Sequence, residues 1–298
     1  MDVILGAEAQ QAARDGNAIV ALESTVYSTL GLPAPHNEDA LQGCLNAIRA
    51  VGAVPAVTAV IDGQLRAGLD DDDYPRLLAG TRKIAERDLA AAVATGLDVG
   101  VTTVSASLAI AAQAGIRAFA TGGIGGVHRG SAVTGDVSAD LGAIARHPVA
   151  TFSAGAKSFL DLPMTLEKLE QLGVPVVGYQ CDEFPAFTAR SSGLPVPIRV
   201  DSADVVAAIV RVQTAANRGL LVVTPVPEGH ALDQQLHDEA LDTALAAADD
   251  AGVHGAAVTP FVLERIAHAT EGRSLPANIA LVVNNATLAA EVAIRIDE

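Results

Sequence analysis

Short apolar runs alternate with alanine-rich amphipathic segments along most of the chain. The apolar runs are apolar throughout rather than at every second position, which is typical of strands buried on both faces of a sheet. The predicted strands are residues 18–22, 54–61, 99–104, 117–121, 149–154, 174–179, 220–224 and 279–283.

The segments between these strands have helical periodicity. The predicted helices are residues 37–51, 87–94, 105–114, 165–172, 203–216, 232–251, 260–270 and 286–296. Strands that alternate with helices predict a layered α/β fold with a mostly parallel sheet. Asp62-Gly63, between VTAVI and QLRAG, predicts a hairpin and therefore one antiparallel part. The chain has no linker-like tract or internal repeat, so a single domain over residues 1–298 is predicted.

Composition narrows the class of protein. Half of the 298 residues are apolar and 18% are charged, which favours a large folded core. The net charge of −16 argues against a nucleic-acid partner but not against an anionic small molecule, because a bound metal can reverse the local sign. Only Cys44 and Cys181 are present, so a reduced, cytoplasmic setting is expected. We expect no signal peptide and no membrane span.

Polar residues follow several predicted strands, where sites form in parallel α/β sheets. Glu23, the Ser105 region, Gly122-Gly123 and Asn284-Asn285 lie at such ends, and Lys157 follows another after a short turn.

Lys157 is one of three lysines in the chain and lies in the apolar segment VATFSAGAKSFL. It could be a surface lysine that opens a helix. It could instead be an amine kept neutral by burial, able to attack a carbonyl carbon and form a Schiff base. Lys168, in an ordinary amphipathic helix, serves as the contrast.

The remaining candidates each have a structural and a chemical interpretation. Residues 121–130 contain five glycines, with His128 and Arg129, and form either a tight structural loop or a phosphate- or polyol-binding loop. Asp136 and Asp140 are expected to share one face of a helix turn, as capping carboxylates or as ligands of a hard divalent cation. Glu23 is either a turn residue or a general acid. Lys83, among charged residues, has a solvated helix face as its default interpretation.

Taken together and in this order, these motifs resemble the pseudouridine-5′-phosphate glycosidase family. The likeness runs from about residue 17 to residue 296. The matching segments are ALEST (21–25), TRKIAERDL (81–89), TTVSASL (102–108), ATGGIGGVHRG (120–130), DVSADL (136–141), SAGAKSFLDL (153–162), VGYQ (177–180), PAF (185–187), TPFVLERI (259–266) and LVVNNATLA (281–289).

The resemblance implies a three-layer α/β/α fold, a homotrimer and one divalent metal per subunit, typically manganese. It implies hydrolysis of pseudouridine 5′-phosphate to uracil and ribose 5-phosphate. The roles it implies are Lys157 as the nucleophile, Glu23 as the proton donor and Asp136 as the metal ligand. It implies substrate contacts by Lys83, Val104, Ser138, Ala139 and Asp140, and His128 and Asn284 or Asn285 are further candidate contacts.

Three competing functions remain open. Relatives of the family join ribose 5-phosphate to another aromatic acceptor, and by microscopic reversibility the same lysine and acid would serve a C-glycoside synthase. A Schiff-base phosphosugar lyase or aldolase would also use a strand-end lysine and a phosphate loop. The third is a nucleotide-binding module without turnover.

Overall fold

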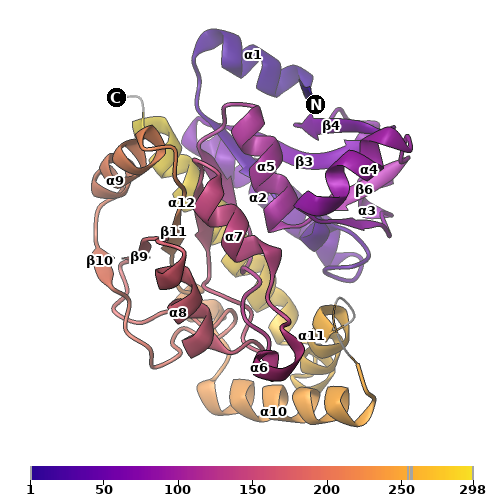
Figure 1. Cartoon of the computed structure of the whole chain (residues 1–298), viewed down its shortest axis with the longest axis vertical. Helices are drawn as coiled ribbons and strands as arrows, with labels where there is room; N and C mark the ends of the chain where they lie inside the picture. Colours follow the sequence, from indigo (N-terminus) through magenta and orange to yellow (C-terminus); the bar gives the residue numbers. More distant parts are fainter. Residues whose placement is uncertain (1, 254, 256–257, 297–298) are drawn as a thin grey trace.

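The computed structural model describes residues 2–253, 255 and 258–296 (Figure 1). The strands are β1 (Val3–Leu5), β2 (Ile19–Leu22), β3 (Val54–Ile61), β4 (Gln64–Ala67), β5 (Lys83–Ile84), β6 (Val99–Thr102), β7 (Ala118–Ala120), β8 (Ala150–Ser153), β9 (Val176–Tyr179), β10 (Ile198–Val200) and β11 (Leu220–Val223). The longer helices are α1 (Ala7–Asp15), α2 (His36–Val51), α5 (Val104–Gln113), α7 (Ala139–Arg146), α8 (Leu162–Gln171), α9 (Ala203–Ala215), α10 (Gln234–Asp250), α11 (Val258–Ala269) and α12 (Ser274–Ile296). Short helical turns are η1 (Thr25–Tyr27), α3 (Asp73–Leu78), η2 (Glu86–Asp88), α4 (Leu89–Ala94), α6 (Ser131–Thr134) and η3 (Glu228–His230).

The strands form one sheet in the order β1-β4-β3-β2-β7-β8-β11-β9-β10, with β6 on β3 and β5 on β6. Among the described strands, the antiparallel pairs are β3 with β4 and β3 with β6. The predicted hairpin is confirmed: Ile61 pairs with Gln64, and Asp62 and Gly63 both have positive φ, of 51° and 71°. Two such residues match the right-handed twist of the strands in a two-residue turn.

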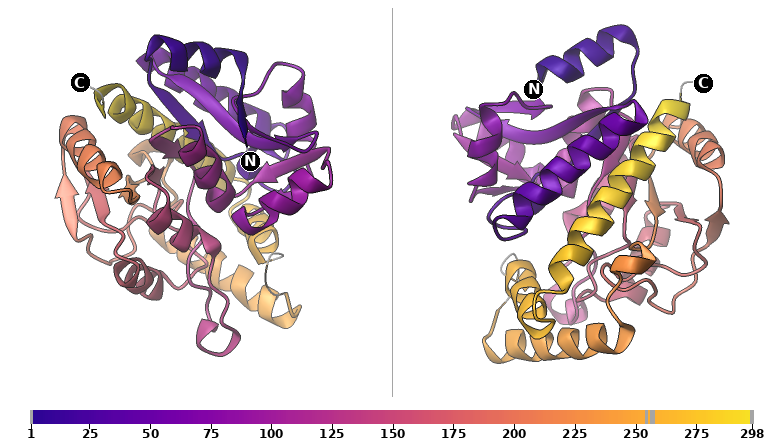
Figure 2. Two further views of the ribbon diagram at one scale, coloured as in Figure 1. Left: turned by 45° about the horizontal axis from the view of Figure 1, so that its top comes forward. Right: turned by 180° about the vertical axis from the view of Figure 1, so that it is seen from behind.

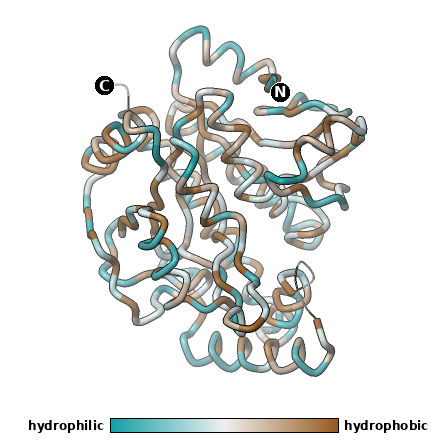
Figure 3. Tube along the Cα trace, in the orientation of Figure 1, coloured by the Kyte–Doolittle hydropathy of each residue, from teal (hydrophilic) through white to brown (hydrophobic). Residues whose placement is uncertain are grey.

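Helices cover both faces of the sheet, which confirms the three-layer α/β/α prediction (Figure 2). One hydrophobic cluster lies between the sheet and α2, α9 and α12, and a second lies between the sheet and α1, α5, α7 and α8. The hydrophobic residues concentrate in these layers, whereas α10 at the edge of the molecule is largely hydrophilic (Figure 3). The apolar strands are therefore buried on both sides, as their composition indicates.

The predicted strand 279–283 is wrong, because this segment is part of α12. The apolar run reflects burial on several sides rather than extended backbone: α12 contacts β2, β7 and β8 as well as α2 and α9. By length and composition α12 could span a membrane, but 56% of its most apolar window is buried inside the protein, as in a core helix. The predicted helix 286–296 is the C-terminal half of the same helix.

Two shorter corrections bear on the site. The predicted strand 99–104 ends at Thr102, and Val104 already begins α5. Lys83 lies in the short strand β5, so the helix of its default interpretation is wrong, although the residue is exposed as that interpretation expects.

The register of the central strands brings their ends together. Leu22 of β2 pairs with Ala120 of β7, and Ala120 pairs with Phe152 of β8. Because these strands are parallel, the residues that follow them emerge side by side at one edge of the sheet.

Candidate active site

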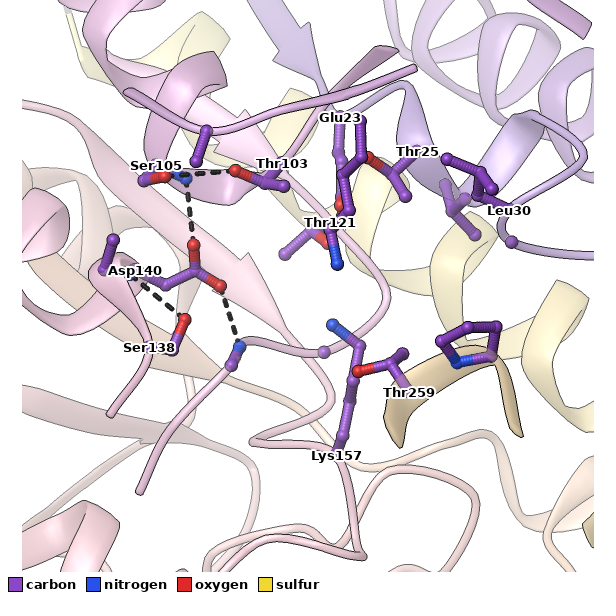
Figure 4. A pocket seen from close by; sticks show the side chains of 18 of the residues that line it. Glu23, Thr25, Leu30, Thr103, Ser105, Thr121, Ser138, Asp140, Lys157 and Thr259 are labelled. Carbon is purple, nitrogen blue, oxygen red and sulfur yellow. Dashed lines mark hydrogen bonds between the residues drawn. The ribbon is translucent and has the colours of Figure 1, made fainter. Parts of the chain in front are cut away.

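A cavity of about 700 Å³ lies at this edge of the sheet. Glu23 enters it after β2, Thr121 after β7 and Lys157 after β8 (Figure 4). The glycine-rich segment after β7 and the first turn of α11 form further parts of its wall. Side chains from distant parts of the chain therefore meet in one concave site of the size that holds a small molecule.

Lys157 is half-buried in the wall of this cavity and does not begin a helix. Its backbone N–H donates to the Ile124 carbonyl at 3.1 Å, and α8 begins only at Leu162. The preceding Gly155 has φ of +73°, and a Cβ there would come within 2.0 Å of the Pro185 carbonyl oxygen. The tight turn that glycine permits directs Lys157 from the end of β8 into the cavity.

Glu23 is buried, with 6% of its surface exposed. Burial raises the pKa of its carboxyl above the ordinary value of 4.5, and the Lys157 charge and the Thr121 hydroxyl offset this only in part. The Thr121 hydroxyl donates a short hydrogen bond to Glu23 Oε2. A carboxyl with a raised pKa, held in a cavity beside an amine, is suited to act as a general acid.

Lys83 and His128 bring further nitrogen atoms to the same cavity. Lys83 is exposed and lines the cavity. Its pKa is lowered below 10.5, mainly because the surrounding protein desolvates the ammonium group and secondly because the Lys157 charge repels it. Burial also lowers the pKa of His128, with Asp136 opposing the effect and Lys157 and Lys83 adding to it. Near neutral pH, His128 is therefore a neutral donor and acceptor.

Asp140 links two parts of the cavity wall by hydrogen bonds. Its carboxylate accepts from the N–H of Ser105 at 3.0 Å and from the N–H of Gly125 at 2.9 Å. Ser138 caps α7 by accepting from the Asp140 N–H at 3.2 Å. Asp140 thus fixes the N-terminus of α5 against the glycine-rich loop.

Asp136 does not share a helix face with Asp140, so that expectation is wrong: α7 begins only at Ala139, and Asp136 lies in the preceding loop. Its carboxylate lines the cavity with 38% of the side chain exposed. Within the described residues its one ion-pair contact is with His128 Nδ1, at 3.9 Å.

The described part of the chain contains no group of three or more His, Cys, Asp or Glu side chains that could enclose a metal ion. A single accessible carboxylate still fits a Mg²⁺-like cation, which keeps several waters and takes one or two carboxylates together with substrate phosphate. Asp136 has this character.

The structure places most of the predicted site residues around the cavity. Those that line it are Glu23, Lys83, His128, Asp136, Ser138, Ala139, Asp140 and Lys157. Val104 and Asn285 do not line it: the Val104 side chain is 1% exposed and Asn285 is fully buried. Asn284 lies off the cavity as well, 3.5 Å from the Thr224 hydroxyl.

Sequence reasoning missed Thr121 as the partner of Glu23, and it missed Asn278, which lines the cavity. Asn278 is 8% exposed, and its Oδ1 has no hydrogen-bond partner among the described residues. Had residues 274–296 been recognised as a helix, Asn278, Leu281 and Asn285 would have fallen on one face toward the strand ends. The incorrect strand prediction concealed this signal.

Known proteins resemble this chain over nearly its whole length. A family model described as indigoidine synthase A like protein matches residues 8–295. A pseudouridine-5′-phosphate glycosidase of Methylobacterium nodulans is 50% identical over 96% of this chain and 86% of its own length. A protein of the same name from Chloroflexus aurantiacus is 49% identical over 98% of this chain and 97% of its own.

Two solved structures share the fold. The prealnumycin C-glycosynthase AlnA in complex with ribulose 5-phosphate has a TM-score of 0.90 and 34% identity, covering 99% of this chain and 97% of that one. An indigoidine synthase A-like protein of Thermotoga maritima has a TM-score of 0.89 and 31% identity, covering 100% and 97%. The chain belongs to the indigoidine synthase A like family and, as its motifs predict, to the pseudouridine-5′-phosphate glycosidase family.

Proposed function

We propose that the protein hydrolyses the carbon–carbon glycosidic bond of pseudouridine 5′-phosphate, giving uracil and ribose 5-phosphate. The observation that carries this proposal is the meeting of Lys157 and the buried acid Glu23 in one cavity, in a chain about half identical to glycosidases of that name. The family motifs and the shape of the cavity support it.

A C-glycoside has no heteroatom leaving group, so the usual reaction through two carboxylates is poorly suited to it. Glu23 protonates the ribose ring oxygen while the Lys157 amine attacks C1′, which opens the ring and leaves a C1′–N bond. Protonation of uracil C5 then allows the C1′–C5 bond to break. Its electron pair goes to the base, and the nitrogen lone pair forms the iminium. Water hydrolyses the iminium, which releases ribose 5-phosphate and the free amine.

The cavity offers separate contacts to the two ends of this substrate. Asn278, whose Oδ1 has no hydrogen-bond partner among the described residues, lies near Gly122 and Phe187 and suits the polar edge of a pyrimidine. Lys83 and the backbone at the N-terminus of α5 suit an anionic phosphate.

We propose Asp136 as the protein ligand of one divalent cation, with manganese as the expected ion. When bound, the cation would supply positive charge for the phosphorylated substrate in this acidic protein. A homotrimer and a cytoplasmic location also remain proposals, the latter supported by the free thiols of Cys44 and Cys181.

The second candidate is the reverse use of the same site, a C-glycoside synthase. The likeness to a C-glycosynthase at 34% identity favours it over an aldolase or a binding module, but the glycosidase relatives are closer in sequence. Comparing rates of cleavage with rates of coupling to other aromatic acceptors separates the two.

The test is release of uracil from pseudouridine 5′-phosphate by the purified protein with Mn²⁺. Turnover is expected for the natural chain and for Lys168→Ala, since Lys168 bonds to Gln171 on the outer helix α8. No turnover is expected for Lys157→Ala. Substantial turnover by a folded Lys157→Ala protein contradicts the mechanism, and no uracil from the natural chain contradicts the function.

A further inference from the structure

Asn285 is a buried side chain with no access to the cavity and yet a direct contact with its wall. It lies on α12, and its Nδ2 donates to the carbonyl oxygens of Thr121 at 2.7 Å and Gly122 at 3.1 Å. Both partners are acceptors only, so the amide nitrogen must face them and the orientation of the amide is determined. The contact joins the last helix to the end of β7.

The carbonyl of Thr121 lies one residue beyond the last residue of β7. On the other side of this segment, the Thr121 N–H donates to the Phe152 carbonyl at 3.0 Å, and the Gly122 carbonyl accepts from the Ala154 N–H at 2.9 Å. Asn285 supplies the donor to the Thr121 carbonyl. A buried carbonyl that loses its partner costs about 1–3 kcal/mol, so this contact fixes the plane of the peptide between Thr121 and Gly122.

Thr121 also bonds directly to the proposed acid, Glu23. Its side-chain hydroxyl donates to Glu23 Oε2, and its backbone is fixed by Asn285. Resting on the proposed function, in which Glu23 is the proton donor, we propose that Asn285 is a positioning residue. It holds Thr121 at the end of β7 so that the Thr121 hydroxyl orients the Glu23 carboxyl toward the substrate.

Asn285 and Asn278 lie on the same helix but make different contacts with the site. Asn278, seven residues earlier and on the same face, reaches the cavity, whereas Asn285 bonds to the backbone that forms its wall. Removing Asn285 should therefore affect the chemical step more than substrate binding.

The variant Asn285→Leu removes both hydrogen bonds while it keeps the number and branching of the side-chain heavy atoms. We expect kcat for uracil release to fall about 100-fold, the effect of misplacing a reacting group by about 1 Å, while KM changes less than about threefold. Thr287→Val is the matched control on the same helix, because within the described part of the chain the Thr287 hydroxyl bonds only to the Val283 carbonyl of α12. Its kcat should stay within about twofold of the natural chain.

A double-mutant cycle distinguishes positioning from a general loss of stability. If Asn285 acts through Thr121, Asn285→Leu combined with Thr121→Val should be no slower than Thr121→Val alone. Multiplied losses in the double variant overturn the proposal. Should Asn285→Leu fail to fold, Asn285→Ser, which keeps a smaller donor, enters the same cycle.

Titration of the Glu23 carboxyl by ¹³C NMR, assigned with Glu23→Gln, gives a readout that needs no substrate. The Thr121 hydroxyl favours the charged carboxylate, so its displacement in Asn285→Leu should move the midpoint to higher pH, as Thr121→Val should. An unchanged midpoint with unchanged kcat overturns the proposal. If Asn285→Leu shifts the midpoint but the natural chain releases no uracil, the effect of Asn285 on Glu23 is supported and the proposed function is refuted.

Discussion

Glu23 and Lys157 are common residue types whose chemistry is set by where the strands end. Glu23 is buried next to a hydroxyl donor, and Lys157 faces it from beyond the end of β8, with β7 between β8 and β2 in the sheet (Figure 4). The nearby Lys83 and His128 both have lowered pKa values because the surrounding protein and the other cations disfavour their charged forms. The cavity thus favours the protonated form of the Glu23 carboxyl and the neutral forms of Lys83 and His128.

The raised pKa of Glu23 makes a prediction about stability. The folded state binds the Glu23 proton more tightly than the unfolded chain, whose carboxyl has a pKa near 4.5. The free energy of unfolding therefore declines as pH rises from 4.5 through the pKa of the folded state.

Glu23→Gln should lower kcat by about 10²–10⁴-fold. Its Tm should exceed that of the natural chain increasingly as pH rises, and the difference should vanish below pH 4.5. Thermal unfolding across pH measures this, and a lower Tm for the variant at neutral pH contradicts it.

Asp136 makes a prediction about metal content. Its accessible carboxylate, with only the distant His128 contact, is expected to bind the divalent cation. Asp136→Asn should bind less Mn²⁺ by about one ion per chain, measured by elemental analysis after dialysis, and chelation should lower turnover of the natural chain but not its helical circular dichroism. An unchanged metal content in Asp136→Asn would show that the cation binds elsewhere.

At the scale of elements, the sequence correctly predicted helices and strands whose pattern of apolar residues is set by the element itself. It failed for α12, whose apolar pattern is set by the other elements that pack around it. The central strands and the hairpin follow from short apolar runs and from Asp62-Gly63. The segment 279–283 looks like a strand because its residues are apolar in succession, and only the packing of α12 between the sheet, α2 and α9 explains this composition.

The site was predictable to a similar extent. Glu23 and Lys157 stand out as polar residues at strand ends. The Thr121–Glu23 bond depends on the register of β2 against β7, and the place of Asn278 depends on the helix that the strand prediction obscured. Neither relation can be read from local sequence.

The contact between α7 and the glycine-rich loop makes a prediction about stability. A Cβ at Gly125 would lie 2.4 Å from Ser138 Oγ and 2.8 Å from Asp140 Oδ2, so Gly125→Ala must disturb the bonds of Asp140. We expect a loss of about 1–3 kcal/mol in the free energy of unfolding, measured with denaturant. Gly229→Ala is the control, since a Cβ there meets no atom within 4 Å. Equal stability of the two variants would contradict the role given to Asp140.

The whole molecule combines a strongly negative net charge with a cavity that contains two of its three lysines. Of the three lysines in a chain of net charge −16, Lys83 and Lys157 line the cavity and only Lys168 lies outside it. The net charge disfavours a nucleic-acid partner, whereas the two lysines in the cavity favour an anionic small molecule.

The family resemblance predicts a homotrimer. Light scattering coupled to size-exclusion chromatography should give three times the 30.2 kDa chain mass. A mass of one chain at micromolar concentration would contradict this prediction without affecting the chemistry proposed for the cavity.

The central claim is that Lys157 bonds covalently to C1′ of the sugar. The most direct measurement is incubation of the protein with ribose 5-phosphate and Mn²⁺, reduction with borohydride, and mass spectrometry of the intact chain and its peptides. We expect one reduced pentose-phosphate adduct on Lys157 and none on Lys168 or Lys83. A folded, metal-loaded protein that binds ribose 5-phosphate but yields no adduct on Lys157 would contradict the covalent mechanism.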